Sequence, residues 1–548
     1  MNKLYPKLFS CMKTYTKEQA VKDVIAGIIV AIIALPLSIA LALASGVGPE
    51  IGLYTAITAG FVISLLGGSR VQIAGPTAAF ASIVAGIIAT SGMDGLIVAT
   101  VLAGIILIIM GFLRLGNLIK FIPYTITTGF TAGIAVTIVI GQLKDFFGLT
   151  FKNSPVEAVD KLEEVVHCFG TINYQAVVIG LLSLTILIIT PKILKKIPPS
   201  LIAVIVSALI VGVFNMDVNT IGDLYKISAQ PPKFSFPDFS IDTVTKVLPD
   251  AVTIAILAGI ESLLSCVVSD GMIGSRHNSN MELVAQGAGN ICSALFGGIP
   301  ATGAIARTAA NVKNGGRTPV SGMVHAVVLF VVLVVLMPYA SLIPMPTIAA
   351  ILFVVAYNMS EWREFVGLVK TAPKSDIVVL VLTFVLTVVF DLVVAICVGL
   401  GLAILLFMKR MADVTVVSGW KYIDENTDED NIRLKKVPKN TYVYEITGPM
   451  FFGVSDKLSE IIRDGNNSVV IIRMRSVPAV DATAIHSMEK ILTSCEKKNI
   501  SLILSHVNDQ PMKILKKSGL YEKIGEANFC ENIDIAIKRA ENILGNRQ

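Results

Sequence analysis

The sequence predicts an α-helical polytopic membrane protein with about fourteen spans, followed by a small soluble domain of mixed α/β structure. Hydrophobic residues make up 54% of the 548 residues and charged residues only 16%, whereas soluble proteins carry about 25% charged residues. Apolar runs recur from residue 24 to residue 408, and charged residues become dense after Arg410. Most of the chain is therefore expected to lie in lipid.

The apolar runs are long enough, or nearly so, to cross a ~30 Å hydrocarbon layer as helices, although several are short or interrupted by Gly and Pro. They lie near residues 24–45, 51–67, 73–91, 95–113, 120–140, 172–190, 198–214, 246–269, 281–297, 300–312, 318–338, 342–357, 375–390 and 391–408. We accordingly expect a cytoplasmic N-terminal segment (1–23), a transmembrane domain (24–410), a linker (411–440) and a C-terminal domain (441–548).

Basic residues in the short connections indicate which ends of the spans face the cytoplasm. Arg70 follows the second span, Arg114 the fourth and Lys409 the fourteenth. The connections near 46–50, 91–95, 298–300 and 338–342 contain no Lys or Arg. The positive-inside rule then predicts a multi-pass protein of the plasma membrane with both termini in the cytoplasm and the longer segments 143–171 and 215–245 outside.

Several classes of function are not expected. The net charge of +5 does not indicate a nucleic-acid partner, because the basic residues flank membrane spans. The five His and seven Cys form no CxxC motif or His cluster, so we expect no metal, no cofactor and no disulfide framework. The chain contains no GxxxxGK[ST] motif, and neither an ATPase nor another enzyme is expected.

Glu261 is the only charged residue in the run from Ala251 to Ser269. At about 1.5 Å per residue it lies roughly 15 Å past Asp250, near the middle of the bilayer. A carboxylate at that depth is costly, so we expect it to face a cavity and to take part in ion or proton movement. The alternative is a buried Glu that is bonded by a neighbouring hydroxyl, such as that of Ser262 or Ser265.

Two segments in different halves of the chain share a pattern of Gly, then Pro, then Thr and small residues. They are VQIAGPTAAFASIVAG (71–86) and FGGIPATGAIARTAAN (296–311). We interpret each as an extended strand that reaches the middle of the membrane, followed by a half-helix. Such backbone is tolerated at that depth only where it lines a cavity or is buried in protein, and paired interruptions of this kind mark transporter substrate sites.

With the orientation above, the two half-helices run in opposite directions and their N-termini meet. Each N-terminus offers unpaired N–H groups and roughly half a positive charge, so the pair forms an anion site. Arg307, about one turn into the second half-helix, adds positive charge. The candidate substrate contacts at the helix starts are Thr77 and Ala78 in the first segment and Thr302, Gly303 and Ala304 in the second. In the alternative interpretation each Gly-Pro only kinks a continuous helix, and Arg307 extends to the cytoplasmic face.

Glu261 also predicts how transport is coupled to a second ion. An ionised carboxylate beside an anion site repels the anion, and a protonated one does not, which is a simple route to proton coupling. A sodium site built from Glu261 and nearby backbone carbonyls is the alternative.

Three further runs carry a resemblance to a known family: ALPLSIALALASGVGPEIGLYTA (34–56), QIAGPTAAFA (72–81) and PATGAIARTAANV (300–312). They resemble signatures of the SulP family, the sulfate-permease-type anion transporters, and the resemblance covers nearly the whole chain. Within that family, the runs at 259–272, 282–290, 357–362 and 386–399 are most similar to the enterobacterial four-carbon dicarboxylate transporter.

The resemblance implies a seven-plus-seven inverted repeat, with spans 1–4 and 8–11 as a core and spans 5–7 and 12–14 as a gate. It also implies an elevator-like motion of the core against the gate, and a homodimer. Substrate contacts are implied on the first, third, eighth and tenth spans, at Leu37 and Leu41, Thr77 and Ala78, Glu261, and Thr302 to Arg307. Some relatives have Gln where Leu37 stands, so this span is expected to offer only apolar contact here.

The C-terminal domain alternates strands and helices, which predicts a small α/β sandwich. We expect strands at 441–447, 468–475 and 500–505, and helices near 453–464, up to about Lys497 and from Asp509. The domain resembles the STAS domain that ends most SulP chains. In related regulators the matching loop carries a phosphorylated Ser or Thr, which implies a regulatory role for Thr483; alternatively, Asp481 only caps the next helix and Thr483 is inert.

Three functions remain open. The first is secondary active transport of a small anion, either sulfate or a C4-dicarboxylate such as succinate or fumarate, coupled to protons. The second is sodium-coupled bicarbonate transport on the same scaffold. The third is a passive anion channel or a membrane-bound STAS signalling scaffold, neither of which needs a carboxylate in mid-membrane. A nucleobase transporter shares the expected fold, but Arg307 beside two positive helix ends favours an anion.

Overall fold

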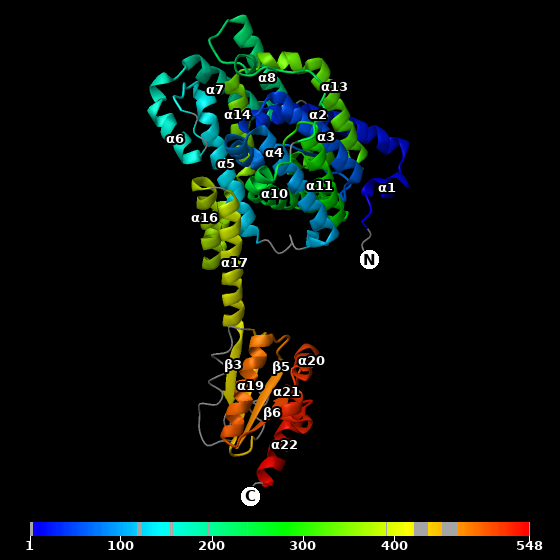
Figure 1. Cartoon of the computed structure of the whole chain (residues 1–548), viewed down its shortest axis with the longest axis vertical. Coiled ribbons are helices and arrows are strands. Elements are labelled where there is room, and N and C mark those ends of the chain that lie inside the picture. The colour runs from blue at the N-terminus through cyan, green and yellow to red at the C-terminus, as the bar shows by residue number, and fades with distance from the viewer. Residues whose placement is uncertain are drawn as a thin grey trace. The chain divides into compact units, whose positions relative to one another are not determined.

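The computed structural model describes residues 4–117, 123–153, 155, 157–193, 198–237, 239–390, 392–420, 437–451 and 468–546. The chain forms two compact units, Met1–Leu400 and Gly401–Gln548, and each is described by itself. The first unit is almost entirely helical, and the second contains a five-stranded sheet (Figure 1).

Each predicted span coincides with a helix, and the helices fall into two successive sets. The first set is α2 (Lys17–Ala44), α3 (Pro49–Leu66), β1 (Ala74–Gly75), η1 (Ala78–Phe80), α4 (Ala81–Phe112), α5 (Tyr124–Phe147), α7 (Tyr174–Ile193) and α8 (Pro199–Val213). The second is α10 (Ile241–Ile273), α11 (Ser279–Leu295), β2 (Thr302–Gly303), α12 (Ile305–Lys313), α13 (Val320–Leu336), α14 (Met345–Met359), α16 (Lys374–Val389) and α17 (Leu392–Val414). Shorter helices connect or flank them: α1 (Lys7–Met12), α6 (Ala158–His167), η3 (Phe169–Thr171), α9 (Ile221–Leu224), η4 (Met337–Leu342) and α15 (Trp362–Thr371).

The predicted third and fourth spans form one helical element with a break. Gly92 in α4 has φ 70° and ψ −172°, a backbone conformation that glycine adopts readily, and it separates the two halves. Among the described residues, 8 helices are long and apolar enough to cross a membrane by themselves. The remaining spans are shorter helices, including the half-helix α12.

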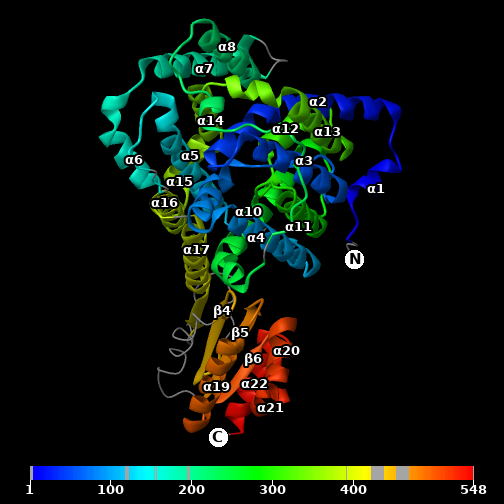
Figure 2. The same cartoon turned by 45° about the horizontal axis from the view of Figure 1, so that its top comes forward.

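The two sets are structural repeats, because their packing partners correspond. The second half of α4 packs on α10 and α11, and its counterpart α13 packs on α2 and α3. In the same way, α16 packs on α5 and α14 packs on α7. Figures 1 and 2 show α4, α10 and α11 side by side in this unit. A repeat of seven spans crosses an odd number of times, so the second repeat is inverted relative to the first.

A buried carboxylate fixes the turn before α13 to the start of α2. Asp23 is fully buried, and its Oδ1 accepts hydrogen bonds from the backbone N–H groups of Arg317 (2.8 Å) and Thr318 (3.4 Å). Its Oδ2 accepts from the Thr318 hydroxyl at 2.5 Å, and Gln19 Nε2 donates to Oδ1 at 2.9 Å. The hairpin of α12 and α13 is thereby held against α2.

The second unit is a five-stranded sheet with helices on both faces. The strands are β3 (Val416–Trp420), β4 (Thr441–Thr447), β5 (Val469–Ser476), β6 (Ser501–Ser505) and β7 (Phe529–Cys530), in that spatial order. All neighbouring pairs are parallel except β3 and β4. The helices are α19 (Ala482–Lys497), α20 (Asp509–Lys517), α21 (Leu520–Ile524), η8 (Glu526–Asn528) and α22 (Ile533–Gly545).

Alternate residues of β5 face two different cores, as expected for a strand covered on both sides. Val470 and Ile472 pack in the core that includes α19, α20 and α21, whereas Val469 and Ile471 pack in the core that includes α22. The three predicted strands and the helices at Lys497 and Asp509 are present. The helix expected near 453–464 lies outside the described residues.

The expected linker at 411–440 is partly regular structure, which corrects that boundary. α17 continues to Val414, and Val416–Trp420 pair with β4 as an edge strand. The run TVV in this stretch is β-branched, so it favours a strand, but its charged surroundings suggested a linker.

Gly52→Ala should lower the thermal stability of the purified protein. A Cβ at this position of α3 would lie 2.1 Å from the backbone oxygen of Ser38 on α2, and backbone cannot move aside as a flexible side chain can. Overpacking of this kind costs about 1–3 kcal/mol. A thermal unfolding scan in detergent measures the effect.

The matched control is Gly86→Ala in α4, where an added Cβ meets no atom within 4 Å. It should leave the melting temperature unchanged or raise it slightly, since Ala favours helix over Gly. Equal melting temperatures for the two variants would show that α2 and α3 do not pack this closely.

Candidate anion site

Two short strands, β1 and β2, cross inside the first unit, and each leads into a helix. They pair antiparallel, with Ala74 opposite Gly303. Thr77 (φ −126°, ψ 157°) and Ala304 (φ −87°, ψ 112°) keep extended backbone and directly precede η1–α4 and α12. The chain is therefore extended and then helical at both places, and the alternative of two continuous kinked helices is wrong.

Both helix starts lie at this strand crossing. The first N–H groups of a helix have no partner within the helix, and they carry roughly half a positive charge. Because β1 and β2 are hydrogen-bonded to each other, the starts of η1–α4 and α12 are near neighbours. Two partial positive charges thus lie close to the β1–β2 pair, where Thr77 and Ala304 are partly exposed.

Side chains complete the hydrogen bonding of the extended backbone. Asn290 on α11 donates from Nδ2 to the backbone oxygen of Ala301 and accepts at Oδ1 from the Ala301 N–H, both at 2.8 Å. Thr308 on α12 accepts at Oγ1 from the Ile73 N–H at 3.0 Å, and the Ala304 N–H donates to the Ile73 oxygen at 2.9 Å. These side chains take the place of the missing neighbouring strands.

Glu261 on α10 points to the start of the first half-helix. The Thr77 hydroxyl donates to Glu261 Oε2 at 3.0 Å. Glu261 is partly exposed. Glu261 is thus bonded by a hydroxyl, but not by that of Ser262 or Ser265, which donate to Glu282 and Gln72.

Arg307 reaches from α12 to the chain that follows β1. It is 4% exposed, and its Nη2 donates to the backbone oxygen of Pro76 at 2.6 Å. Its Nη1 is buried without a hydrogen-bond partner among the described residues. The side chain therefore does not extend to the cytoplasmic face, and it offers an unused N–H donor next to two positive helix ends.

Gly75 explains how the guanidinium can lie so close to β1. A Cβ at Gly75 would be 2.5 Å from Arg307 Nη1, so a side chain here would displace the arginine. The glycine of the first Gly-Pro pair is thus required by a close approach between the two repeats. The sequence had suggested a different role for this Gly-Pro pair, namely to interrupt a helix.

The other predicted site residues differ in what they can offer. Ala78 begins η1 and is buried, and Ala304 directly precedes α12. The Thr302 hydroxyl donates to the backbone oxygen of Ala258 at 2.8 Å, so its hydrogen is already used. Leu37 is partly exposed and Leu41 is buried on α2, which packs on α12, and both offer apolar contact only.

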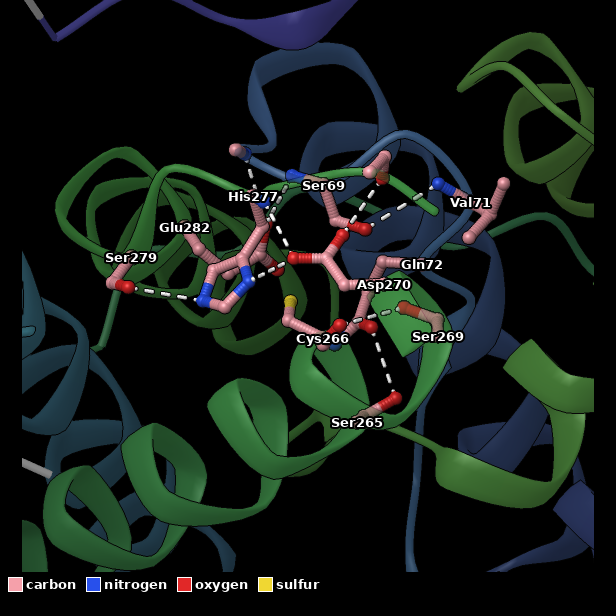
Figure 3. A network of polar contacts seen from close by, with 12 residues as sticks. Ser69, Val71, Gln72, Ser265, Cys266, Ser269, Asp270, His277, Ser279 and Glu282 are labelled. Atoms are coloured by element: carbon pink, nitrogen blue, oxygen red, sulfur yellow. Dashed lines mark hydrogen bonds and ion pairs between the residues drawn. The ribbon is translucent and has the colours of Figure 1, made fainter. Parts of the chain in front are cut away.

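The sequence analysis did not identify a group of buried polar side chains next to the crossing (Figure 3). Gln72 donates to the Ser262 hydroxyl and accepts from the Ser265 hydroxyl, and Glu282 accepts from Ser262. Glu282 was missed because it lies at the edge of a predicted span, where a charged side chain is normally solvated. The sequence signal that could have revealed the group is the number of polar residues within the apolar runs of 246–269 and 281–297.

Three residues around the α10–α11 turn are arranged like a hydrolase triad: Asp270 near the end of α10, His277 in the turn and Ser279 at the start of α11. His277 Nδ1 lies 2.7 Å from Asp270 Oδ2, and Ser279 Oγ lies 2.9 Å from His277 Nε2 (Figure 3). The His277 N–H and the Ser275 hydroxyl also bind the Asp270 carboxylate. The side chains of His277 and Asp270 are only 10% and 15% exposed, so we interpret the group as a clamp on this turn.

Comparison with known families agrees with this geometry. Residues 21–383 match the sulfate permease family, and residues 432–536 match the STAS domain. The "Putative sulfate transporter YvdB" of Bacillus subtilis is 41% identical over 527 residues, which cover 95% of this chain and 98% of that protein. The bicarbonate transporter BicA of a Picosynechococcus strain is 30% identical over 538 residues, which cover 94% of each chain.

Two solved structures are also similar. The murine Slc26a9 anion transporter in the inward-facing state superposes with a TM-score of 0.87, covering 98% of this chain and 94% of that one. At 19% sequence identity this likeness concerns the fold alone. The transmembrane domain of a cyanobacterial BicA superposes with a TM-score of 0.63 at 31% identity, covering 70% of this chain and 98% of that one.

Arg307→Gln should raise the dissociation constant for sulfate at least tenfold, because the buried positive charge and its unused N–H are lost. A tenfold change corresponds to about 1.4 kcal/mol, a modest value for a charge-assisted hydrogen bond. Calorimetric titration of the purified protein with sulfate measures it. Arg276→Gln, at an exposed position of the α10–α11 turn, is the control and should bind as the wild type does. Equal affinities for the two variants would remove Arg307 from the site.

Proposed function

Since the chain belongs to the sulfate permease family, and is thus an anion transporter and not an enzyme, we propose that it carries a small dianion together with a proton. The substrates we propose are sulfate or a C4-dicarboxylate such as succinate or fumarate. One observation carries the proposal: two helix starts, the Arg307 guanidinium and the Glu261 carboxylate all lie at one strand crossing.

The positive groups at the crossing account for binding of a dianion. Backbone N–H groups at helix starts bind anions directly, and the unused Nη1 donor of Arg307 adds a full charge. Among the described residues, no ion pair neutralises this guanidinium, so an anion is the natural counter-charge. Because helix ends recognise charge and size only, sulfate and dicarboxylates both fit. The 41% identity to a protein named as a putative sulfate transporter supports sulfate as the first candidate.

The surroundings of Glu261 support the proposal that transport is coupled to a proton. Its carboxylate is bonded by one hydroxyl, that of Thr77, which itself begins the first half-helix. A bound dianion repels the ionised carboxylate and favours the protonated one, and by linkage the proton favours the dianion equally. Dianion and proton would thus bind together, and the net charge that crosses the membrane would be reduced by one.

Packing within the first unit supports an elevator-like motion. α3, α4, α10, α11, α12 and α13 pack mainly on one another, and α5, α7, α14 and α16 form a second group. α2 and η1 contact both groups, so the strand crossing lies near their boundary. We propose that the first group, with α2, moves as the core against the second. Distances between spin labels on α4 and α7, measured with and without sulfate, would refute this by staying constant.

Sodium-coupled bicarbonate transport is the second candidate. It is favoured by the 30% identity, over 94% of the chain, to a protein named as a bicarbonate transporter. In this version Glu261 remains ionised and holds sodium together with nearby carbonyl oxygens. Uptake into proteoliposomes that requires sodium and ignores a pH gradient would establish this candidate instead of proton coupling.

We also propose that the protein is a homodimer in the plasma membrane with both termini in the cytoplasm. The alternation of basic and charge-free connections supports the orientation. Labelling of single cysteines from each side of intact cells tests the orientation, and mass measurement in detergent tests the dimer.

Glu261→Gln should abolish sulfate accumulation driven by a pH gradient in proteoliposomes, leaving at most equilibration. Gln resembles the protonated Glu, so exchange of labelled for unlabelled sulfate should continue, whereas coupling is lost. Glu163→Gln, whose carboxylate is 70% exposed on α6, should accumulate sulfate normally. Unchanged accumulation by Glu261→Gln would remove Glu261 from the coupling step and point to another coupling residue. Competition by bicarbonate, succinate and fumarate in the same vesicles identifies the preferred anion.

Thr483 is our proposed regulatory site in the second unit. It is exposed in the first turn of α19, where a phosphate is favoured by the helix start. Asp481 caps this helix by accepting from the Ala484 N–H at 2.8 Å, so the cap is present in either interpretation.

Thr483→Glu should change the maximal rate of sulfate uptake at least twofold, because it places a negative charge at the start of α19. Uptake by wild-type and variant proteoliposomes measures it. Thr493→Glu is the control, since Thr493 is exposed on the same helix far from its start. Equal rates for both variants would leave Thr483 without a regulatory role.

A further inference from the structure

Glu282 is a fully buried carboxylate that the anion site does not use directly. It lies in the first turn of α11 and is 0% exposed. Its Oε2 accepts from the backbone N–H groups of Gly68 (2.9 Å) and Ser69 (3.0 Å). Its Oε1 accepts from the Ser262 hydroxyl (3.2 Å) and from Gln286 Nε2 (3.0 Å). One carboxylate thus joins the turn after α3, the middle of α10 and the start of α11.

We propose that Glu282 is a positioning residue for transport, which sets where the Glu261 carboxylate stands relative to β1. Ser262, which it holds, is the next residue to Glu261 on α10. Gly68 and Ser69, which it also holds, lead into β1 and to Thr77, the partner of Glu261. This inference rests on the proposed function. It adds Glu282 as a residue that acts on the site through Ser262, Gly68 and Ser69.

The contacts continue from Ser262 to both half-helices. Gln72 donates from Nε2 to the Ser262 hydroxyl at 3.1 Å and accepts at Oε1 from the Ser265 hydroxyl at 2.9 Å. Ser265 lies 3.3 Å from the Thr308 hydroxyl of α12, which accepts from the Ile73 N–H next to β1. The same face of α10 therefore bonds to the residues before β1 and to α12.

Close packing makes this arrangement rigid. A Cβ at Gly68 would lie 2.1 Å from the backbone oxygen of Asn278 and 2.8 Å from the Glu282 nitrogen, so the turn after α3 lies directly on the start of α11. The Asn278 N–H also donates to the Gly68 oxygen at 2.9 Å. Asp270 and His277 fix the preceding turn, as described above. A shift of Glu282 would therefore shift Ser262 and the residues before β1 together.

The chemistry of the four partners requires a carboxylate. Two are backbone N–H groups, one is an amide Nε2 and one is a hydroxyl, and each donates to Glu282. A carboxylate has about four acceptor sites and no donor, so it matches this set. Gln in its place would direct an NH2 group at donors and leave at least one of them unpaired.

The test is sulfate uptake by proteoliposomes of the full chain, at equal amounts of folded protein. Ser262→Ala removes the link from Glu282 to α10 and should raise the KM for sulfate about tenfold, with the maximal rate within twofold of the wild type. Ser265→Ala should raise KM in the same way. Ser269→Ala is the matched control: Ser269 is a buried serine on the same helix, and its hydroxyl donates only to Cys266 of that helix. Its KM should stay within twofold.

Glu282→Gln should raise KM at least as much as Ser262→Ala, and the double variant should show no further increase, because Glu282 acts on α10 through Ser262. Additive effects, or equal KM for Ser262→Ala and Ser269→Ala, would overturn the positioning role. If Glu282→Gln does not fold, the KM values of Ser262→Ala, Ser265→Ala and Ser269→Ala still test the positioning role. Wild-type vesicles that take up no anion would instead refute the proposed function, which separates the two failures.

Discussion

The pairing of β1 with β2 in an apolar interior is the constraint on which the rest of the first unit depends. Extended backbone leaves its N–H and C=O groups unpaired along both edges, and at membrane depth no water is available to bind them. Two residues per strand satisfy only part of this need. Part of the remainder is supplied by Asn290 of α11, which bonds the backbone of Ala301, and by Thr308 of α12, which accepts from the Ile73 N–H. The crossing can therefore form only when both repeats are assembled.

The same assembly gives two neighbouring carboxylates different surroundings. Glu282 is enclosed by four donors and acts as a fixed acceptor, whereas Glu261 has one hydroxyl partner and is partly exposed. The four donors occupy the acceptor sites of Glu282 and hold it in place. Glu261 keeps free acceptor sites that a proton or a cation can use. Such a pair suits a transporter, in which one acid holds the structure and the other responds to the substrate.

The sequence was sufficient for the membrane fold and for the groups that carry charge. Lone Glu261 in an apolar run and the two Gly-Pro segments led directly to the strand crossing, because isolated charges and broken helices are rare in lipid. Pairings between distant residues could not be predicted. Arg307 binds the oxygen of Pro76, and Glu282 binds Gly68 and Ser69, across more than two hundred residues. Periodicity shows which residues lie on one face of a helix but not which other helix that face meets.

The expectation of a linker after Arg410 was wrong for a related reason. Strand β3 is an edge strand, and an edge strand is recognised by its partner more than by its own composition. Thr302, in turn, was expected at a helix start as a substrate contact. It lies in β2, and its hydroxyl donates to the backbone oxygen of Ala258 on α10. The sequence could not show that this hydroxyl is already bonded.

The packing around Gly303 limits how this scaffold could acquire a new selectivity. A Cβ at that position would overlap Gln72 Nε2, so the place that a side chain would fill already holds the amide of the segment before β1. A larger residue at Gly303 would therefore have to displace Gln72, which bonds Ser262 and Ser265 of α10. The adjustable positions are those at the two helix starts, Thr77, Ala78 and Ala304, where replacement alters the solute's surroundings without dismantling the strand pair.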